Sequence, residues 1–379
     1  MKKTFALIHF PYYQLDPDKG RGVEHFIKKY LEIEGNQVII IRPDLPFFDI
    51  FFKIIRLIYK TFGKDYHFYR KKVILNYLSK SVNKKLDAIN YDYIIAFGTL
   101  PLYNITSNKK IIMWSDATFQ NILNYYNDYK NLSIAQINEF ENIEKDVLKK
   151  VNFVCLTSSW ATETAIDHYK LSKRKVFEIP FGANLLDEVE VDIEDLKNKS
   201  NNLETLELLF IGKNWERKGG EKLFDLATKL KKKNINFKLK IIGCSPAIPE
   251  NLQTNIKSYG LLDKRKNDEN QLFNELLKKS HFFIMPSTAE AFGHVYCEAN
   301  AYGIPAIGNK TGGVTSVILD NINGFTFNKE SFVVDCFNYL KNIQNNNEEY
   351  LNLCLRSRKR YEEYLNWHTS IKKILNIIQ

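Results

Sequence analysis

The sequence predicts an α/β protein with two doubly wound domains that face each other across a cleft, each built on a parallel β-sheet. Short apolar runs alternate with amphipathic segments from both ends of the chain, the order that produces parallel sheets. The 379 residues exceed one ordinary core and suit two domains of about 180 residues each. Between them, residues 186–204 are polar and acidic at first, as expected of an interdomain connection.

The N-terminal domain is expected over residues 1–185. Its first strand, at residues 3–10, precedes a loop with two glycines, an amphipathic helix at 23–35 and a second strand at 36–43. Its later strands are expected at residues 91–98, 109–115, 152–159 and 175–182.

The C-terminal domain is expected over residues 205–355, and residues 356–379 are expected to form a helix that packs back on the N-terminal domain. The strands of the C-terminal domain are expected at residues 206–213, 237–243, 281–286 and 305–308. In doubly wound domains, ligands bind beyond the carboxyl ends of the strands.

Positive charge is concentrated in the N-terminal domain. Residues 1–185 hold 27 Lys and Arg against 19 Asp and Glu, a balance of +8, so the remaining 194 residues carry only +2 of the total of +10. Basic clusters of this kind attract anionic lipid headgroups, phosphorylated acceptors or nucleic acid, while a solvated face without a partner explains any single cluster equally well. Basic motifs interleaved with aromatic residues on a nucleic-acid fold are lacking, so nucleic acid is not an expected partner.

The most apolar stretch is at residues 46–62, where Asp49, Lys53, Arg56 and Lys60 follow one another at steps of four, three and four. This spacing predicts a helix with one narrow, mostly basic stripe and a wide apolar face. Such a helix either buries that face against its own domain or inserts it into a membrane interface, with the lysines extending to the headgroups. The basic N-terminal domain adds to the membrane interpretation.

Two further observations concern the compartment. No apolar stretch reaches the roughly 18 residues that span a bilayer, and the N-terminal segment is broken too soon by His9 and Pro11 to resemble a signal peptide. The five cysteines are odd in number and widely spaced, which argues against a disulfide framework or a zinc site. We expect a cytoplasmic protein, with a peripheral position on the inner face of the cell membrane if residues 46–62 bind lipid.

The most informative segment is at residues 281–313. It begins as a buried strand that ends at Pro286 and Ser287, continues through a loop that contains Glu290, and then enters a helix. Phe292, Gly293 and His294 would lie at the helix start, where backbone N–H groups and the helix dipole favour a phosphate.

Glu298 lies about one turn into the same helix, and its carboxylate can accept hydrogen bonds from the two hydroxyls of a ribose. Glu290 faces whatever lies beyond the phosphate. The arrangement predicts a site for a nucleotide joined to a hydroxyl-rich group, whereas two merely solvated glutamates are the structural alternative.

This segment resembles the retaining glycosyltransferases of family 4, whose signature is two glutamates separated by seven residues within a longer pattern. The matching residues are Pro286, Ser287, Glu290, Phe292, Gly293, Glu298, Ala299, Ala301, Gly303, Pro305, Ile307, Gly312, Gly313, Asn323 and Gly324. The resemblance implies the GT-B architecture of two Rossmann-like domains, with the nucleotide-sugar bound to the C-terminal one. It also implies that Glu290 contacts donor-sugar hydroxyls, that Glu298 holds the ribose, and that the backbone at residues 292–294 positions sugar and phosphate.

A second group of candidate residues follows the strand at 206–213, where Lys213, Arg217 and Lys218 crowd one strand-to-helix turn. Cations at this place would stabilise the negative charge that grows on a departing diphosphate. The family pattern has Arg and Lys in contact with the diphosphate. Lys218 matches the Lys, while Lys213 occupies the Arg position and keeps the charge without the bidentate fork. Arg217 is a supporting candidate.

The N-terminal domain is expected to supply the acceptor side. Gly20 and Gly22 resemble the glycine loop after the first strand of the family, where the backbone approaches the sugar-phosphate. Asp116 follows a predicted strand, where many relatives place a polar residue near the reacting sugar, and it is our catalytic candidate beside Glu290 and Lys218. Ser115 or Asp116 could instead cap the next helix, as Ser158 or Ser159 could cap another.

No cofactor and no metal are expected. Asp16-Pro17-Asp18 mimics the Asp-x-Asp of metal-dependent glycosyltransferases but lies in the first loop and reads as a turn. We therefore expect a retaining glycosyltransferase that uses a nucleotide-sugar, UDP- or GDP-sugar first, and a lipid-linked or cell-surface saccharide acceptor. A sugar-nucleotide-binding protein or an epimerase of the same fold is the alternative.

Overall fold

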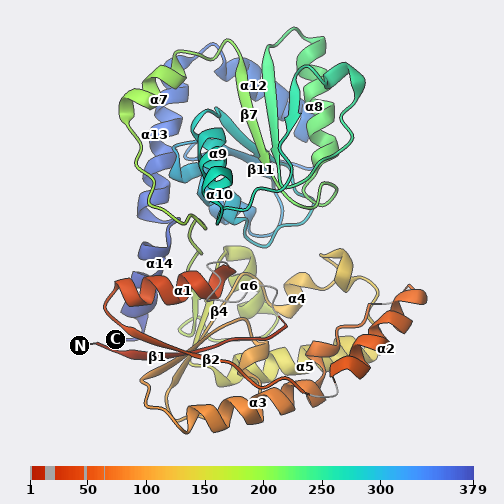
Figure 1. Ribbon diagram of the computed structural model, residues 1–379, viewed down its shortest axis with the longest axis vertical. Helices are drawn as coiled ribbons and strands as arrows, with labels where there is room; N and C mark the ends of the chain where they lie inside the picture. The colour runs from red at the N-terminus through yellow and green to blue at the C-terminus, as the bar shows by residue number, and fades with distance from the viewer. Residues whose placement is uncertain (1, 13–21, 47–48, 64) are drawn as a thin grey trace. The chain divides into compact units, whose positions relative to one another are not determined.

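The computed structural model describes residues 2–12, 22–46, 49–63 and 65–379, and the chain divides into two compact units. Unit 1 comprises Met1–Pro180 and Ile371–Gln379, and unit 2 comprises Phe181–Ser370. Each unit is a parallel β-sheet with helices on its faces (Figure 1). The predicted α/β class, with two doubly wound domains, is therefore confirmed.

The sheet of unit 1 has six parallel strands in the order β2-β1-β3-β4-β5-β6. The strands are β1 (Thr4–Ile8), β2 (Gln37–Ile41), β3 (Tyr93–Phe97), β4 (Lys110–Ser115), β5 (Phe153–Leu156) and β6 (Val176–Glu178). The inner strands are buried on both faces, as their continuous apolar runs require. The strand order reverses between β1 and β3, which makes the carboxyl ends of these two strands the expected ligand crevice of unit 1.

The helices of unit 1 lie on both faces of this sheet, with α1 and α3 on opposite sides (Figure 1). They are α1 (Gly22–Ile33), α2 (Asp49–Thr61), α3 (Lys72–Leu86), α4 (Phe119–Ile122), α5 (Ile134–Lys150) and α6 (Ser159–Asp167), with short 3-10 helices η2 (Phe68–Arg70), η3 (Leu100–Leu102) and η4 (Asn127–Tyr129). The core between β1, β3, α3 and α5 is made of aliphatic side chains such as Ile8, Leu78 and Val147.

The sheet of unit 2 also has six parallel strands, in the order β12-β11-β10-β7-β8-β9. The strands are β7 (Leu206–Ile211), β8 (Phe237–Ile242), β9 (Ile256–Ser258), β10 (Phe282–Met285), β11 (Ala306–Asn309) and β12 (Gly324–Phe327). The helices are α7 (Ile193–Ser200), α8 (Gly220–Lys232), α9 (Asn267–Lys278), α10 (His294–Ala301), α11 (Val314–Val317), α12 (Phe332–Ile343) and α13 (Asn347–Glu363), with the 3-10 helix η5 (Glu250–Leu252). The last helix, α14 (Trp367–Ile377), begins in unit 2 and ends in unit 1. Here the order reverses between β7 and β10, so the loops after these two strands flank the switch point.

The predicted boundaries differ from the observed units. Residues 186–204 were expected to be a plain connection, but they lie inside unit 2 and form α7, which packs against α13. Leu196 and Ser200 of α7 are buried, whereas Ile193, its other apolar residue, is exposed. Residues 356–379 do not form one helix. The end of α13 and the whole of α14 share this range, and unit 2 ends within α14 after Ser370.

The helix predicted at residues 46–62 is α2, and its apolar face is not buried. Phe51, Leu57 and Phe62 expose 59%, 66% and 74% of their surface, and Ile54 and Ile58 are also exposed. Phe52 alone of its aromatic residues packs partly against the core of unit 1. No helix in the described part of the chain is long and apolar enough to cross a membrane.

Candidate functional site

Three loops of unit 2 meet at the switch point, one after each of the neighbouring strands β7, β10 and β11. The backbone N–H of Thr288 donates to the carbonyl oxygen of Arg217 at 2.8 Å, which joins the first loop to the second. Asn309 joins the second to the third, because its Nδ2 donates to the carbonyl oxygens of Pro286 at 2.7 Å and Ser287 at 3.0 Å. The candidate residues of the two motifs are thus held on a common, hydrogen-bonded platform.

Gly219 permits the closest approach between these loops. It has a φ of 75°, and a Cβ atom built on it would lie 2.0 Å from the carbonyl oxygen of Pro286. A side chain here would be strained by its own backbone and would collide with the neighbouring loop. The glycine before α8 is therefore required for the two motifs to lie together.

Glu290 lies at the centre of the site, and two cations surround it. The residue is 8% exposed, and Lys218 forms an ion pair with its Oε2. The Nη1 atom of Arg217 lies 3.7 Å from the same oxygen and donates to the carbonyl oxygen of Ala289 at 2.8 Å. Burial lowers the pKa of Lys218, and Glu290 opposes that shift. Two positive groups on one carboxylate leave an excess of positive charge, which favours an anionic ligand.

Glu298 occupies the inner face of α10 and is only 3% exposed. Its Oε2 accepts a hydrogen bond from the Nζ of Lys264 at 2.8 Å, and the same Nζ lies 3.3 Å from the carbonyl oxygen of Asn184. The Lys264 ammonium also lies 4.0 Å from the centre of the Phe273 ring. Burial raises the pKa of Glu298, and Lys264 partly offsets the shift. Lys264 was not predicted, because it lies in a loop 34 residues away that matches neither motif.

His294, the first residue of α10, is held in one tautomer. Its Nδ1–H donates to the carbonyl oxygen of Gly182 at 3.0 Å, and its ring stacks on Phe181 with the ring centres 5.3 Å apart and on Trp367 at 6.2 Å. Burial lowers its pKa to about 4. The imidazole is therefore neutral near pH 7, and its Nε2 remains an acceptor.

The backbone before α10 follows the prediction for Phe292 and Gly293. The Phe292 side chain is buried and its ring centre lies 5.6 Å from that of Phe181, so only its backbone is available to a ligand. Gly293 has a φ of 93°, and a Cβ on it would lie 2.6 Å from the Tyr296 ring. This glycine allows the chain to turn into the helix without displacing the buried tyrosine.

Of the remaining predicted residues, Lys213 lies in unit 2, on the loop after β7. Lys213 is exposed on its loop, and its side chain makes no hydrogen bond or ion pair within the described residues. Asp116 and Gly22 belong to unit 1, where Asp116 follows β4 and Gly22, with a φ of 80°, begins α1. Gly20 lies outside the described residues.

Of the two predicted helix caps, the one at α6 is confirmed and the one at α4 is wrong. Thr118, rather than Ser115 or Asp116, caps α4, and its side chain accepts from the backbone N–H of Asn121. Asp116 is therefore not needed as a helix cap. Ser158 caps α6, as predicted, by accepting from the N–H of Ala161 at 3.3 Å.

Unit 1 contains a buried acid–base pair that sequence reasoning missed. His9 follows β1 and Glu24 lies in the first turn of α1, and the Nδ1 of His9 lies 2.5 Å from the Oε2 of Glu24. The two residues are 8% and 4% exposed. A histidine that ends an apolar strand next to a glycine loop was the only available signal.

The described residues contain no group of three or more His, Cys, Asp or Glu side chains that could hold a metal ion. The Asp16-Pro17-Asp18 segment lies outside those residues. All five cysteines are free thiols.

Comparisons with known proteins agree with this geometry. Residues 192–359 match the family model of glycosyl transferases group 1. An uncharacterized 41.2 kDa protein in the cps region of Klebsiella pneumoniae is 28% identical over 194 residues, which cover 50% of this chain and 51% of that protein. An uncharacterized glycosyltransferase of Methanocaldococcus jannaschii is 31% identical over 127 residues, which cover 32% of this chain and 34% of that protein. The chain thus spans about half or less of the length of these curated relatives.

A solved structure resembles the whole chain. The crystal structure of a glycosyltransferase from Rickettsia africae matches with a TM-score of 0.67 at 18% identity and covers 99% of this chain and 97% of that one. The likeness shows the GT-B fold of two Rossmann-like domains. Residues 192–359, which match the family model, contain both the Lys218 loop and the two motif glutamates.

Proposed function

We propose that this protein is a retaining glycosyltransferase that transfers a sugar from a nucleotide-sugar, UDP- or GDP-sugar first, to a saccharide acceptor. The observation that carries the proposal is the buried Glu290, held by Lys218 and Arg217 at the switch point of unit 2, with Glu298 on the adjoining helix. An anion-binding cluster beside a buried carboxylate matches the two ends of a nucleotide-sugar, namely its diphosphate and its ribose. Retention follows from the family-4 pattern that these residues share.

The donor-side roles follow from the charges. Glu298 accepts hydrogen bonds from the ribose hydroxyls, and Lys264 partly offsets the rise in pKa that burial causes in its carboxyl group. The backbone at Phe292, Gly293 and the neutral His294 positions sugar and phosphate. In these roles the buried groups are oriented before the donor arrives, which lowers the cost of binding.

The transfer step depends on negative charge that develops on the leaving diphosphate. Lys218 and Arg217 lie together at the place where this charge would appear, and they stabilise it more in the transition state than in the ground state. Glu290 contacts hydroxyls of the donor sugar and orients Lys218. Lys213, which is exposed, adds a weaker and more screened attraction. No metal enters this scheme, and Asp116, Gly20 and Gly22 are proposed for the side of the sugar and its acceptor.

We further propose a lipid-linked or cell-surface saccharide as the acceptor, reached from the inner face of a membrane by a cytoplasmic, peripheral enzyme. The exposed apolar face of α2 and the +8 charge of residues 1–185 support this choice. Apolar side chains beside basic ones bind anionic bilayers through burial and electrostatic attraction together.

The test is binding of a panel of UDP-, GDP-, ADP- and CDP-sugars, measured by thermal shift on the wild type, Glu298→Ala and Glu275→Ala. Glu275 is an exposed glutamate of α9 and serves as the matched control. We expect one nucleotide class to stabilise the wild type and the control by a few degrees and to leave Glu298→Ala unchanged. If no nucleotide-sugar stabilises any of these proteins, the proposal is refuted. Conversion of a bound donor into its epimer without acceptor would instead identify an epimerase.

A further inference from the structure

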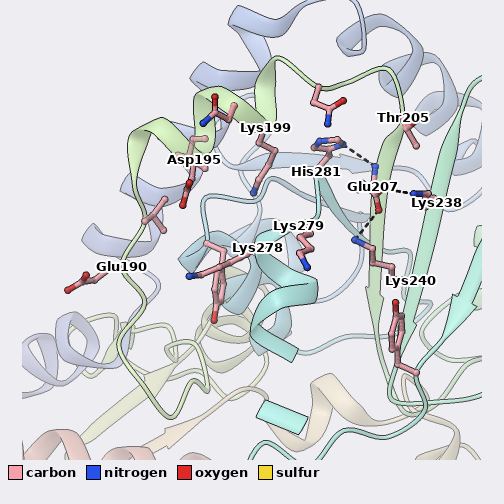
Figure 2. Close-up of a pocket in the computed structure, with 16 residues that line it drawn as sticks. Glu190, Asp195, Lys199, Thr205, Glu207, Lys238, Lys240, Lys278, Lys279 and His281 are labelled. Carbon is pink, nitrogen blue, oxygen red and sulfur yellow. Dashed lines mark hydrogen bonds and ion pairs between the residues drawn. The ribbon is translucent and has the colours of Figure 1, made fainter. Parts of the chain in front are cut away.

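Unit 2 contains a pocket at the amino ends of its strands, whereas the Glu290 site lies at their carboxyl ends. The volume of this pocket is about 870 Å³, and it lies under α7 beside the amino ends of β7 and β8 (Figure 2). Its lining includes Glu207 of β7, Lys240 of β8 and His281, which immediately precedes β10. None of the residues assigned to the donor takes part in this lining.

The pocket is rich in lysine. Five lysines line it, Lys199, Lys238, Lys240, Lys278 and Lys279, against the three acids Glu190, Asp195 and Glu207. Glu207 is already neutralised, because its carboxylate lies 2.9 Å from the Nζ of Lys240 and 3.6 Å from that of Lys238. Lys279 lies 3.5 Å from the carboxylate of Glu275, which is outside the lining, so the five lysines and these four acids leave a formal excess of one positive charge.

Two of the lining groups are buried and oriented. Lys240 is 9% exposed and His281 is 4% exposed. The Nδ1 of His281 accepts the backbone N–H of Glu207 at 3.0 Å, so the proton of the neutral ring resides on Nε2. That Nε2–H donates to no residue in the described part of the chain. Burial, with help from Lys199 and Lys240, lowers the pKa of His281 to about 4, so the ring is a neutral donor at pH 7.

Lys199 supplies the unmatched charge. It projects from α7 into the space above the sheet (Figure 2), and within the described residues its ammonium has no hydrogen-bond or ion-pair partner. Burial lowers its pKa, and the charge of Asp195 offsets that shift only in part. An anion placed between Lys199, Lys240 and His281 would restore these missing interactions.

We infer that this pocket is a second anion site, built for a small phosphomonoester that carries hydroxyl groups. A phosphate offers oxygens to the ammonium groups of Lys199 and Lys240 and to the Nε2–H of His281, and the side chains of Asn198, Asn202 and Thr205 offer partners for hydroxyls. The volume exceeds that of inorganic phosphate and lies in the range of pockets for small organic ligands.

The pocket is separate from the proposed donor site. The six residues of β7 lead from Thr205 and Glu207 at one end to Gly212 and the Lys218 loop at the other, a span of roughly 20 Å at about 3.3 Å per residue. A phosphomonoester and a nucleotide-sugar can therefore bind at the same time. The inference stands whether or not the donor is a nucleotide-sugar.

Isothermal titration with glucose 6-phosphate, inorganic phosphate and sulfate tests the inference on the full chain, in phosphate-free buffer. Three proteins are compared with the wild type: Lys199→Gln, the matched control Lys232→Gln at an exposed lysine of α8 outside the pocket, and Glu298→Ala. We expect glucose 6-phosphate to bind at least tenfold more tightly than sulfate. Lys199→Gln should weaken it at least tenfold, while Lys232→Gln and Glu298→Ala should stay within about twofold of the wild type.

Three results would overturn the inference. They are the absence of saturable binding by glucose 6-phosphate, equal weakening by Lys199→Gln and Lys232→Gln, and loss of binding in Glu298→Ala. The last would show that the phosphate enters the donor site. Thermal unfolding of Lys199→Gln gives a check on folding, because its midpoint should match that of Lys232→Gln within a few degrees.

Discussion

Glu290 shares one carboxylate oxygen between Lys218 and Arg217, so the charge balance of the site depends on single side chains. Loss of Lys218 would remove the cation closest to the carboxylate and would leave Arg217 as its cationic neighbour. Lys213 is on the same loop but exposed, so water and salt already screen it. A comparison of the two lysines therefore distinguishes a cation that acts on the leaving group from one that only adds to the local potential.

We predict that Lys218→Met lowers kcat by about 10²- to 10³-fold, the effect expected when a preorganised group that stabilises transition-state charge is removed. Lys213→Gln should cost less than about tenfold. Initial rates with the nucleotide-sugar that gives a thermal shift check both values. Equal losses in the two variants would show that general basicity, not the Lys218–Glu290 geometry, supports turnover.

Two buried histidines should make the stability of the folded protein depend on pH. The pKa values of His281 and His294 fall from 6.5 to about 4 on folding, so the unfolded chain takes up protons first as the pH decreases. The stability that the neutral rings contribute is therefore present above about pH 6.5 and is lost as the pH falls toward about 4. Burial raises the pKa of Glu298, and this shift changes stability with pH in the opposite direction.

We predict that His281→Gln flattens this acid-induced loss. A shift from 6.5 to about 4 corresponds to at most roughly 3 kcal/mol for one histidine. Unfolding free energy from urea titrations at pH 7.5, 6.5, 5.5 and 4.5, in phosphate-free buffer, should fall less steeply in the variant than in the wild type. Parallel curves would mean that His281 titrates normally in the folded chain. The lower starting stability of the variant does not affect the comparison of slopes.

At the scale of elements, Gly219 allows the loop that contains Lys218 to approach the loop that follows β10. Gly35, which follows α1 in unit 1, has a similar positive φ of 81° but has nothing within 4 Å of an added Cβ. The pair separates backbone strain, which both positions share, from the collision with Pro286, which only Gly219 has.

We predict that Gly35→Ala destabilises the chain by about 1 kcal/mol and leaves nucleotide-sugar binding intact. Gly219→Ala should cost clearly more and abolish the thermal shift by the donor, because the 2.0 Å contact must be relieved by moving one loop. Urea unfolding and the thermal-shift panel measure the two effects. Retained donor binding in Gly219→Ala would show that the loops can separate without harm to the site.

Much of the element order follows from the sequence, because buried parallel strands read as short apolar runs and glycines mark the turns. The strands β7, β8 and β10 and the motif at 286–307 lie where the sequence predicts them. The helix α7 was missed because only Leu196 marks its buried face, so its composition resembles a linker. The break between α13 and α14 was missed because residues 356–379 contain no proline or glycine that would predict it.

The candidate site was predictable only where a local motif carries it. Glu290, Glu298 and Lys218 lie within continuous patterns, so spacing alone was sufficient to find them. Lys264 reaches Glu298 from a different loop, and Glu24 reaches His9 from the next helix. Pairs of this kind depend on how elements pack, and the sequence carries no local signal for them.

At the scale of the whole molecule, the basic charge of residues 1–185 is partly neutralised within unit 1. Lys71 pairs with Glu139 at 2.7 Å and Lys85 with Asp44 at 2.6 Å, so part of this positive charge is already paired with carboxylates. Lys173 and Arg174 remain exposed. The net +8 is unchanged by such pairs, and it still attracts an anionic surface over a Debye length.

We predict that the double variant Leu57→Gln and Phe62→Gln loses binding to anionic vesicles. Both side chains are mostly exposed in or next to α2, and burying such a side chain in a bilayer interface contributes roughly 1.5–3 kcal/mol. Co-sedimentation with phosphatidylglycerol-containing vesicles should weaken at least tenfold, while Ile134→Gln, an exposed apolar residue that begins α5, should bind like the wild type. Phosphatidylcholine vesicles should bind all three proteins weakly, because the basic charge then has no partner. Undiminished binding by the double variant would assign membrane attraction to charge alone, and the exposed face of α2 would need another explanation.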